Sequence, residues 1–185
     1  MEILAEYDLV VRQKLAWPSA ETEGAVWAVG CLFVPSFHAE CAVSIASDKN
    51  TSALRVHSLS RSCWRHLCVR RGESSSDPID FVEPALAIET IELELEASDR
   101  LRKMFDLCDL SSKGKGFGAD GMGVYGQRFL PTPASFNWWS GEAGDGRFRF
   151  VEILHTAAKT FAKWEASTTA LDGVSLYFHD RYLGE

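Results

Sequence analysis

The chain has 185 residues, of which 46% are hydrophobic and 24% are charged. This length suits a single domain over residues 1–185, and the composition excludes collagen, coiled coils and intrinsically disordered chains. Asp and Glu number 26 against 19 Lys and Arg, which gives a formal net charge of −7. That charge disfavours binding to nucleic acids and anionic membranes and favours a basic protein partner.

The first residues are acidic and mixed in character, without a basic stretch followed by an apolar one. We therefore expect no signal peptide, and the absence of any apolar run of about 18 residues predicts no transmembrane helix. The chain contains five cysteines, an odd number. Together these features predict reduced thiols and a cytoplasmic protein.

The N-terminal half predicts mainly strands. Residues 6–17 fit either a strand or a helix, and Pro18 ends both. Four short segments with apolar or β-branched residues predict further strands: 25–34, 41–46, 53–58 and 64–70. Residues 90–96 alternate strictly between apolar residues and glutamates, which predicts a strand with one buried and one exposed face.

The second half predicts two helices and more strands. Ser98 is the expected N-cap of a short helix whose apolar stripe is Leu101, Met104, Phe105 and Cys108. A long helix is predicted over 147–165, with apolar residues on one face. Strands are predicted over 122–130, 135–139 and 174–178. The expected fold is α+β, an antiparallel sheet with two main helices, the longer one packed on the sheet.

The glycine-rich segment 116–121 matches a dinucleotide-binding pattern, but such a site needs a strand before the glycines and a helix after them. Here a helix precedes and a strand follows, so a loop is the favoured interpretation and no cofactor is expected. Asp120 starts that strand as a turn residue. It is also a candidate acid if a partner such as His155 lies near it.

Two close pairs of residues, His38 with Cys41 and Cys63 with His66, could supply four zinc ligands, with Cys68 nearby. In the expected strand over 64–70, however, Cys63 and His66 would point to opposite faces. Buried cysteines that pack as small apolar residues are the favoured interpretation, so no metal is predicted.

Charge is unevenly distributed along the chain. Residues 73–99 contain nine acidic side chains and no Lys or Arg, whereas residues 55–71 contain five Arg and no acid. The two segments could neutralise each other as neighbouring strands. Alternatively, the acidic side chains bind a basic partner, and the candidate partner-binding residues are then Asp77, Asp80, Glu92, Glu94 and Glu96.

Trp138 and Trp139 are adjacent within a predicted strand. Because neighbouring side chains on a strand point to opposite faces, one of them must point into the core. Tryptophan is enriched among the residues that dominate protein interfaces. We therefore add Trp139 to the candidate partner-binding residues.

Within residues 118–164, three segments, 118–125, 136–139 and 150–154, give an Asp-Gly followed by a Tyr-containing strand, a Trp-rich strand and a helix. This arrangement resembles immunity proteins of bacterial toxin systems over about a quarter of the chain. The loop 141–146 departs from the pattern. The resemblance implies a non-catalytic cytoplasmic protein that binds and neutralises a cognate toxin. The alternative is a small enzyme or ligand-binding protein with a pocket near Asp120 and His155.

Overall fold

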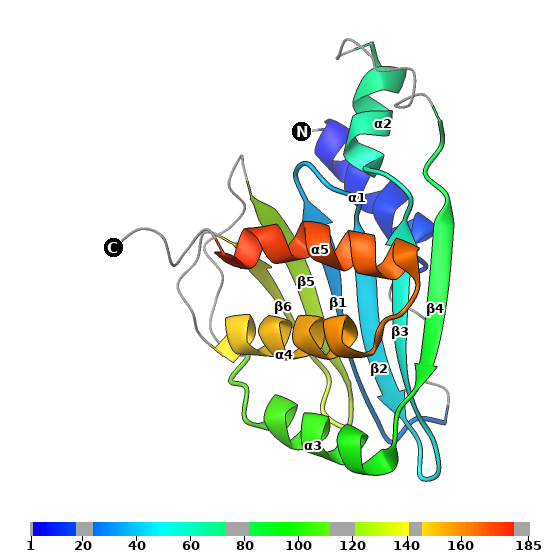
Figure 1. Cartoon of the computed structure of the whole chain (residues 1–185). Coiled ribbons are helices and arrows are strands. Elements are labelled where there is room, and N and C mark those ends of the chain that lie inside the picture. The colour runs from blue at the N-terminus through cyan, green and yellow to red at the C-terminus, as the bar shows by residue number, and fades with distance from the viewer. Residues whose placement is uncertain (1, 18–23, 73–81, 112–120, 141–145, 180–185) are drawn as a thin grey trace.

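The computed structural model describes residues 2–17, 24–72, 82–111, 121–140 and 146–179. Within these ranges the fold is one antiparallel sheet with helices on both faces, which confirms the predicted α+β class (Figure 1). The strands are β1 (Trp27–Pro35), β2 (Cys41–Ser47), β3 (Ser52–Leu59), β4 (Leu86–Glu92), β5 (Met122–Leu130) and β6 (Ala134–Trp139). Their order across the sheet is β4-β3-β2-β1-β5-β6, so β4 and β6 form its two edges.

The helices are α1 (Glu2–Lys14), α2 (Cys63–Arg70), α3 (Leu95–Asp106), α4 (Gly146–Phe161) and α5 (Glu165–His179). Figure 1 shows α4 and α5 side by side across one face of the sheet, with α3 below them, α1 behind the strands and α2 at the upper end of the strands. The larger core lies between the sheet and α3, α4 and α5, and a smaller one lies under α1 and α2.

The N-terminal segment, which fits either a strand or a helix in sequence, forms the helix α1. Tyr7, Val11 and Leu15 are all buried and are spaced four residues apart. That spacing places Tyr7 and Val11 on one side of α1, and Leu15 directly after the helix packs against the same part of the sheet.

The predicted long helix is present as α4, and its buried side includes Val151, Leu154 and Ala158 as expected. It ends at Phe161 rather than at Glu165. The buried carboxylate of Glu89 accepts hydrogen bonds from the backbone N–H groups of Lys163 (2.8 Å) and Trp164 (3.2 Å). Because Glu89 comes from β4, a contact distant in sequence sets the break between α4 and α5.

Two predicted strands are helices. Residues 64–70 belong to α2, where the Ser62 side chain accepts a hydrogen bond from the N–H of Arg65 as an N-cap. Residues 174–178 belong to α5. In both cases a few alternating apolar residues also fit one side of a helix, and packing on the sheet selected the helix.

The predicted strand over 90–96 is wrong in its bounds. β4 ends at Glu92, and α3 begins at Leu95 with Glu94 as its N-cap residue. Ser98, the predicted N-cap, lies buried inside α3, where it accepts a hydrogen bond from the Ser52 hydroxyl at 2.7 Å. Glu92, Glu94 and Glu96 therefore do not line one face of a single strand.

Candidate functional site

A half-open groove with a volume of about 820 Å³ lies between α1 and the sheet, over residues of β1, β5 and β6. Its aromatic lining residues are Tyr7, Phe37, Trp64, Tyr125 and Trp139, and most of its other lining residues are aliphatic. We call it the aromatic groove. Its volume falls in the range of about 300–1,000 Å³ that is typical of ligand pockets.

The groove exists because α1 and α2 cover only part of their face of the sheet. Leu32 of β1 and Ala42 of β2 are buried under these helices, whereas Tyr125 of β5 is only partly buried. On β6, the last strand, Trp139 is also partly buried. The uncovered strip beside α1 is the floor of the groove.

The two neighbouring tryptophans separate as predicted. Trp138 is 1% exposed and packs in the larger core, where its ring lies 5.5 Å from that of Phe148. Trp139 projects from the opposite face of β6 into the aromatic groove. Its indole rests against Gly121, where an added Cβ would lie 2.6 Å from the ring. Gly121 also has φ +145°, so glycine is required there for conformation and for space.

One side of the groove carries a charged cluster from α1. Arg12 pairs with Asp8 at 2.9 Å, and its guanidinium carbon lies 4.3 Å from the centre of the Tyr125 ring. Burial, reinforced by the charge of Asp8, raises the pKa of Tyr125 above its ordinary value near 10. The guanidinium group of Arg12 thus already occupies one face of the Tyr125 ring as a cation–π contact.

Part of the wall of the groove is fixed by Glu40, which is fully buried. Its carboxylate accepts hydrogen bonds from the Tyr7 hydroxyl (2.6 Å) and from the backbone N–H groups of Cys63 (2.8 Å) and Trp64 (3.2 Å). Burial raises the pKa of Glu40, although these hydrogen bonds oppose the shift, and burial also raises the pKa of Tyr7. A carboxylate at the N-terminus of α2 is favourable because unpaired N–H groups point toward it.

Sequence reasoning did not identify Tyr7, Glu40 or Trp64 as parts of a site. The Ser62 N-cap was the one local signal that could have predicted α2 and hence the position of Trp64. Glu40 precedes α2 by more than twenty residues, so no local pattern links it to that helix.

The predicted partner-binding acids lie far from Trp139 in the fold. Glu92, Glu94 and Glu96 are exposed at the junction of β4 and α3, whereas Trp139 belongs to β6 at the opposite edge of the sheet (Figure 1). Asp77 and Asp80 lie outside the described residues. The predicted set therefore contains two separate surfaces.

The alternative of internal charge pairing requires the two segments to be neighbours, and β3 and β4 are neighbouring strands of the sheet. Glu83 pairs with Lys14 of α1 at 2.6 Å, and Glu96 lies 3.9 Å from Arg100 one turn along α3. Glu89 points into the core and binds backbone N–H groups. The pKa of Glu83 is lowered mainly by Lys14 and further by His66 and Arg70 of the 55–71 segment. Glu89 and Glu96 have contacts with groups outside that segment.

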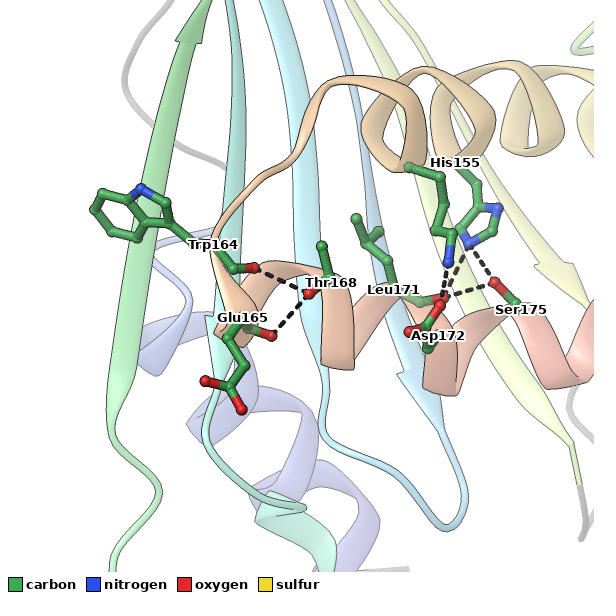
Figure 2. Close-up of polar contacts among 8 residues, drawn as sticks. His155, Trp164, Glu165, Thr168, Leu171, Asp172 and Ser175 are labelled. Atoms are coloured by element: carbon green, nitrogen blue, oxygen red, sulfur yellow. Dashed lines mark hydrogen bonds and ion pairs between the residues drawn. The ribbon is translucent and has the colours of Figure 1, made fainter.

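His155 lies on the other face of the sheet from the aromatic groove. Figure 2 shows it between α4 and α5, with Nε2 at 3.1 Å from the carbonyl oxygen of Leu171 and 3.2 Å from the Ser175 hydroxyl. Its ring also packs on Phe178, 4.8 Å between centres. His155 is a hydrogen-bonded core histidine, and Asp120 lies outside the described residues.

The four residues considered for zinc are dispersed. Cys41 is buried in the larger core and Cys63 in the smaller one, on opposite faces of the sheet. The His38 ring packs edge-on against Tyr177, 5.7 Å between centres. In the part of the chain that the structure covers, no three His, Cys, Asp or Glu side chains gather as a metal site would require.

Comparison of the chain with family models, curated proteins and solved structures gives no match. Within the described ranges, none of the helices combines the length and apolar character needed to cross a bilayer.

Proposed function

We propose that this chain is a non-catalytic cytoplasmic protein that binds and neutralises a cognate, basic toxin domain, as bacterial immunity proteins do. The observation that carries the proposal is the position of Trp139, half-buried in an aromatic groove on the outer face of an edge strand. The resemblance of three sequence segments to immunity proteins supplies the class of partner. The net charge of −7 supports a basic one.

An aromatic groove of this kind suits a protein partner. Trp and Tyr are enriched among interface residues whose truncation costs about 2 kcal/mol or more of binding free energy. Two Trp and two Tyr side chains line the groove. Tyr7 and Trp64 are held edge to face at 5.2 Å between ring centres, so this part of the surface is ordered before a partner arrives.

The polar side chains of the groove support binding rather than catalysis. Among its described lining residues, the ionisable ones are Tyr7, Asp8 and Tyr125. Tyr7 is hydrogen-bonded to Glu40, and Asp8 is paired with Arg12. Burial raises the pKa of both tyrosines, so neither is poised to exchange a proton near neutral pH.

The direct test measures binding to the protein encoded next to this one, because toxin and immunity genes are neighbours. Trp139→Ala should weaken the association by about 30-fold or more, as measured by titration calorimetry. Trp164→Ala is the matched control. Its side chain is 54% exposed beside β4, and the substitution keeps the backbone N–H that binds Glu89. It should change the affinity by less than about threefold.

Two further measurements complete the test. Circular dichroism must show that both variants are folded. Co-expression with the toxin should then restore growth for wild type and Trp164→Ala but not for Trp139→Ala. Absence of binding by the wild type, or equal affinities for the two tryptophan variants, contradicts the proposal.

A further inference from the structure

The strand β4 forms one edge of the sheet, and its pairing with β3 is regular along its whole length. The ladder continues past both ends of the strand. Ser60 donates to the carbonyl of Ala85 at 2.9 Å, and Leu93 donates to the carbonyl of Ser52 at 2.8 Å. No strand of the described ranges pairs with the other side of β4.

The register defines which backbone groups point outward. In an antiparallel ladder, hydrogen-bonded and non-hydrogen-bonded residue pairs alternate. Since Ala85 and Leu93 bond to β3, the odd-numbered residues between them do so as well. The N–H and C=O groups of four residues therefore face the open edge: Leu86, Ile88, Thr90 and Glu92.

The side chains of the same four residues lie on the face of the sheet away from α4 and α5. Ile88 and Leu86 are 43% and 42% exposed, which is high for large apolar residues in a sheet. Natural edge strands are protected by charged side chains, especially Lys, by Pro or by a bulge. β4, Leu-Ala-Ile-Glu-Thr-Ile-Glu, has no Lys, Pro or bulge within its bounds, and its outward-facing charge is confined to Glu92 at its C-terminal end.

The edge is also held in place. Glu89, at the middle of β4, is 3% exposed, and its carboxylate binds the start of α5 through the N–H groups of Lys163 and Trp164. The carboxylates of Glu92, Glu94 and Glu96 are exposed where the strand passes into α3. The surface is thus a rigid, partly apolar strand edge with negative charge at its C-terminal end.

We propose that β4 is a strand-addition site that pairs with an extended segment of a protein partner. The segment carries apolar residues opposite Leu86 and Ile88 and Lys or Arg residues beside Glu92, Glu94 and Glu96. Main-chain hydrogen bonds supply affinity in this mode of recognition, and alternate side chains supply specificity. A basic segment is favoured over a second copy of the chain, because two copies would each carry a charge of −7. This inference takes from the proposed function only the expectation that the partner is a protein.

The test selects short linear peptides from a random phage-displayed library on the immobilised full chain. Fluorescence anisotropy of the labelled selected peptides then measures their affinity for the chain. Thr90→Pro removes one outward N–H and leaves the ladder to β3 intact, and proline is tolerated at such edge positions. Thr90→Ala is the matched control, because it keeps the N–H. The selected peptides should alternate apolar residues beside a basic end. Their affinity should fall about tenfold for Thr90→Pro and less than threefold for Thr90→Ala.

Charge and stability are checked separately. Glu92→Lys should weaken the basic peptides and reduce the salt dependence of their binding. If Thr90→Pro lowers the melting temperature, Ile88→Lys gives an independent test, since it keeps the N–H but places a charge on the edge. Its effect on peptide affinity should match that of Thr90→Pro.

Three outcomes overturn the inference. One is the failure to enrich any peptide, and another is enrichment of peptides that bind Thr90→Pro as well as the wild type. The third is a concentration-dependent dimer in sedimentation that Thr90→Pro abolishes, since a second copy would then occupy the edge. Trp139→Ala leaves peptide binding at β4 unchanged, so this test and that of the proposed function fail independently.

Discussion

The hydroxyl group of Tyr7 donates a hydrogen bond of 2.6 Å to the carboxylate of Glu40, and both side chains are buried. Tyr7 belongs to α1, and the same carboxylate accepts the N–H groups of Cys63 and Trp64 at the start of α2. One buried acid thus holds the two helices that cover this face of the sheet. Because Tyr7 and Trp64 line the aromatic groove, this contact also fixes part of its wall.

Tyr7→Phe should lower the free energy of unfolding by about 1–3 kcal/mol, because it leaves a buried carboxylate with one donor fewer. Tyr177→Phe is the control: its partly buried hydroxyl accepts from the N–H of Phe37 at a longer 3.2 Å. Its cost should stay below about 1 kcal/mol. Urea denaturation followed by circular dichroism measures the free energy of unfolding of both variants. Equal losses would show that the Tyr7–Glu40 hydrogen bond stabilises the fold no more than the Tyr177 contact does.

The stability of the protein should depend on pH through Glu40. Burial raises its pKa in the folded state above the ordinary value of 4.5, so the folded chain binds this proton more tightly than the unfolded chain does. The contribution of Glu40 to stability is therefore fully present below a pH of about 4.5 and is lost as pH rises through the raised pKa. Glu40→Gln removes this titration.

Urea denaturation of wild type and Glu40→Gln across this pH range isolates the effect. The wild type should lose stability relative to Glu40→Gln as pH increases from 4.5 toward neutrality. A difference that is constant with pH, or that grows in favour of the wild type, would show that the pKa of Glu40 is not raised.

All five cysteines carry free thiols in the structure, as the sequence predicts. Four are buried, and Cys68 is partly exposed. Burial raises the pKa of Cys31 and raises that of Cys63 to about 12, so neither forms a thiolate readily. With Ellman's reagent at about pH 8, one thiol should react quickly in the native protein. All five should react after denaturation without reductant, and fewer than five would indicate a disulfide.

Leu154→Ala should cost about 2–5 kcal/mol in the free energy of unfolding, because Leu154 of α4 is fully buried in the larger core. Leu176→Ala gives the matched control on α5, where the leucine is 55% exposed. That change should cost less than about 1 kcal/mol. A small loss at Leu154 would mean that the core can close around the missing side chain.

Glu96 lies in the first turn of α3, where a negative charge is favourable next to the unpaired N–H groups of the helix. Glu96→Lys should lower stability by about 0.5 kcal/mol, and high salt should reduce the loss. Glu92→Lys, at the end of β4, reverses a charge outside the helix and should have a smaller effect. Equal losses from the two reversals would argue that the helix terminus contributes nothing to the role of Glu96.

Much of the sheet could be predicted from local pattern. The strand over 122–130 has the predicted bounds, and β2, β3 and β6 cover the ranges predicted for them. The divergence of Trp138 and Trp139 also follows from sequence alone, because successive side chains of any strand point to opposite faces. The apolar side of α4 was predictable for a similar reason, since eleven or more residues suffice to distinguish a helical period.

Short segments were not predictable in this way. Residues 64–70 and 174–178 contain too few apolar positions to separate a strand from one side of a helix. The alternation over 90–96 spans a real boundary, because β4 ends at Glu92 and α3 begins at Leu95. Which structure forms there depends on what the sheet and the helices on it can bury.

The sequence by itself determined the α+β class, the negative charge, the reduced cysteines and the outward direction of one tryptophan. Tertiary structure decided the site. It placed Trp139 and the glutamates of the β4–α3 junction at opposite edges of the sheet, and it left His155 in the core. It also brought Glu40 under Tyr7 and the start of α2. Those contacts join residues far apart in the chain, and only the packing of helices on the two faces of the sheet fixes their distances.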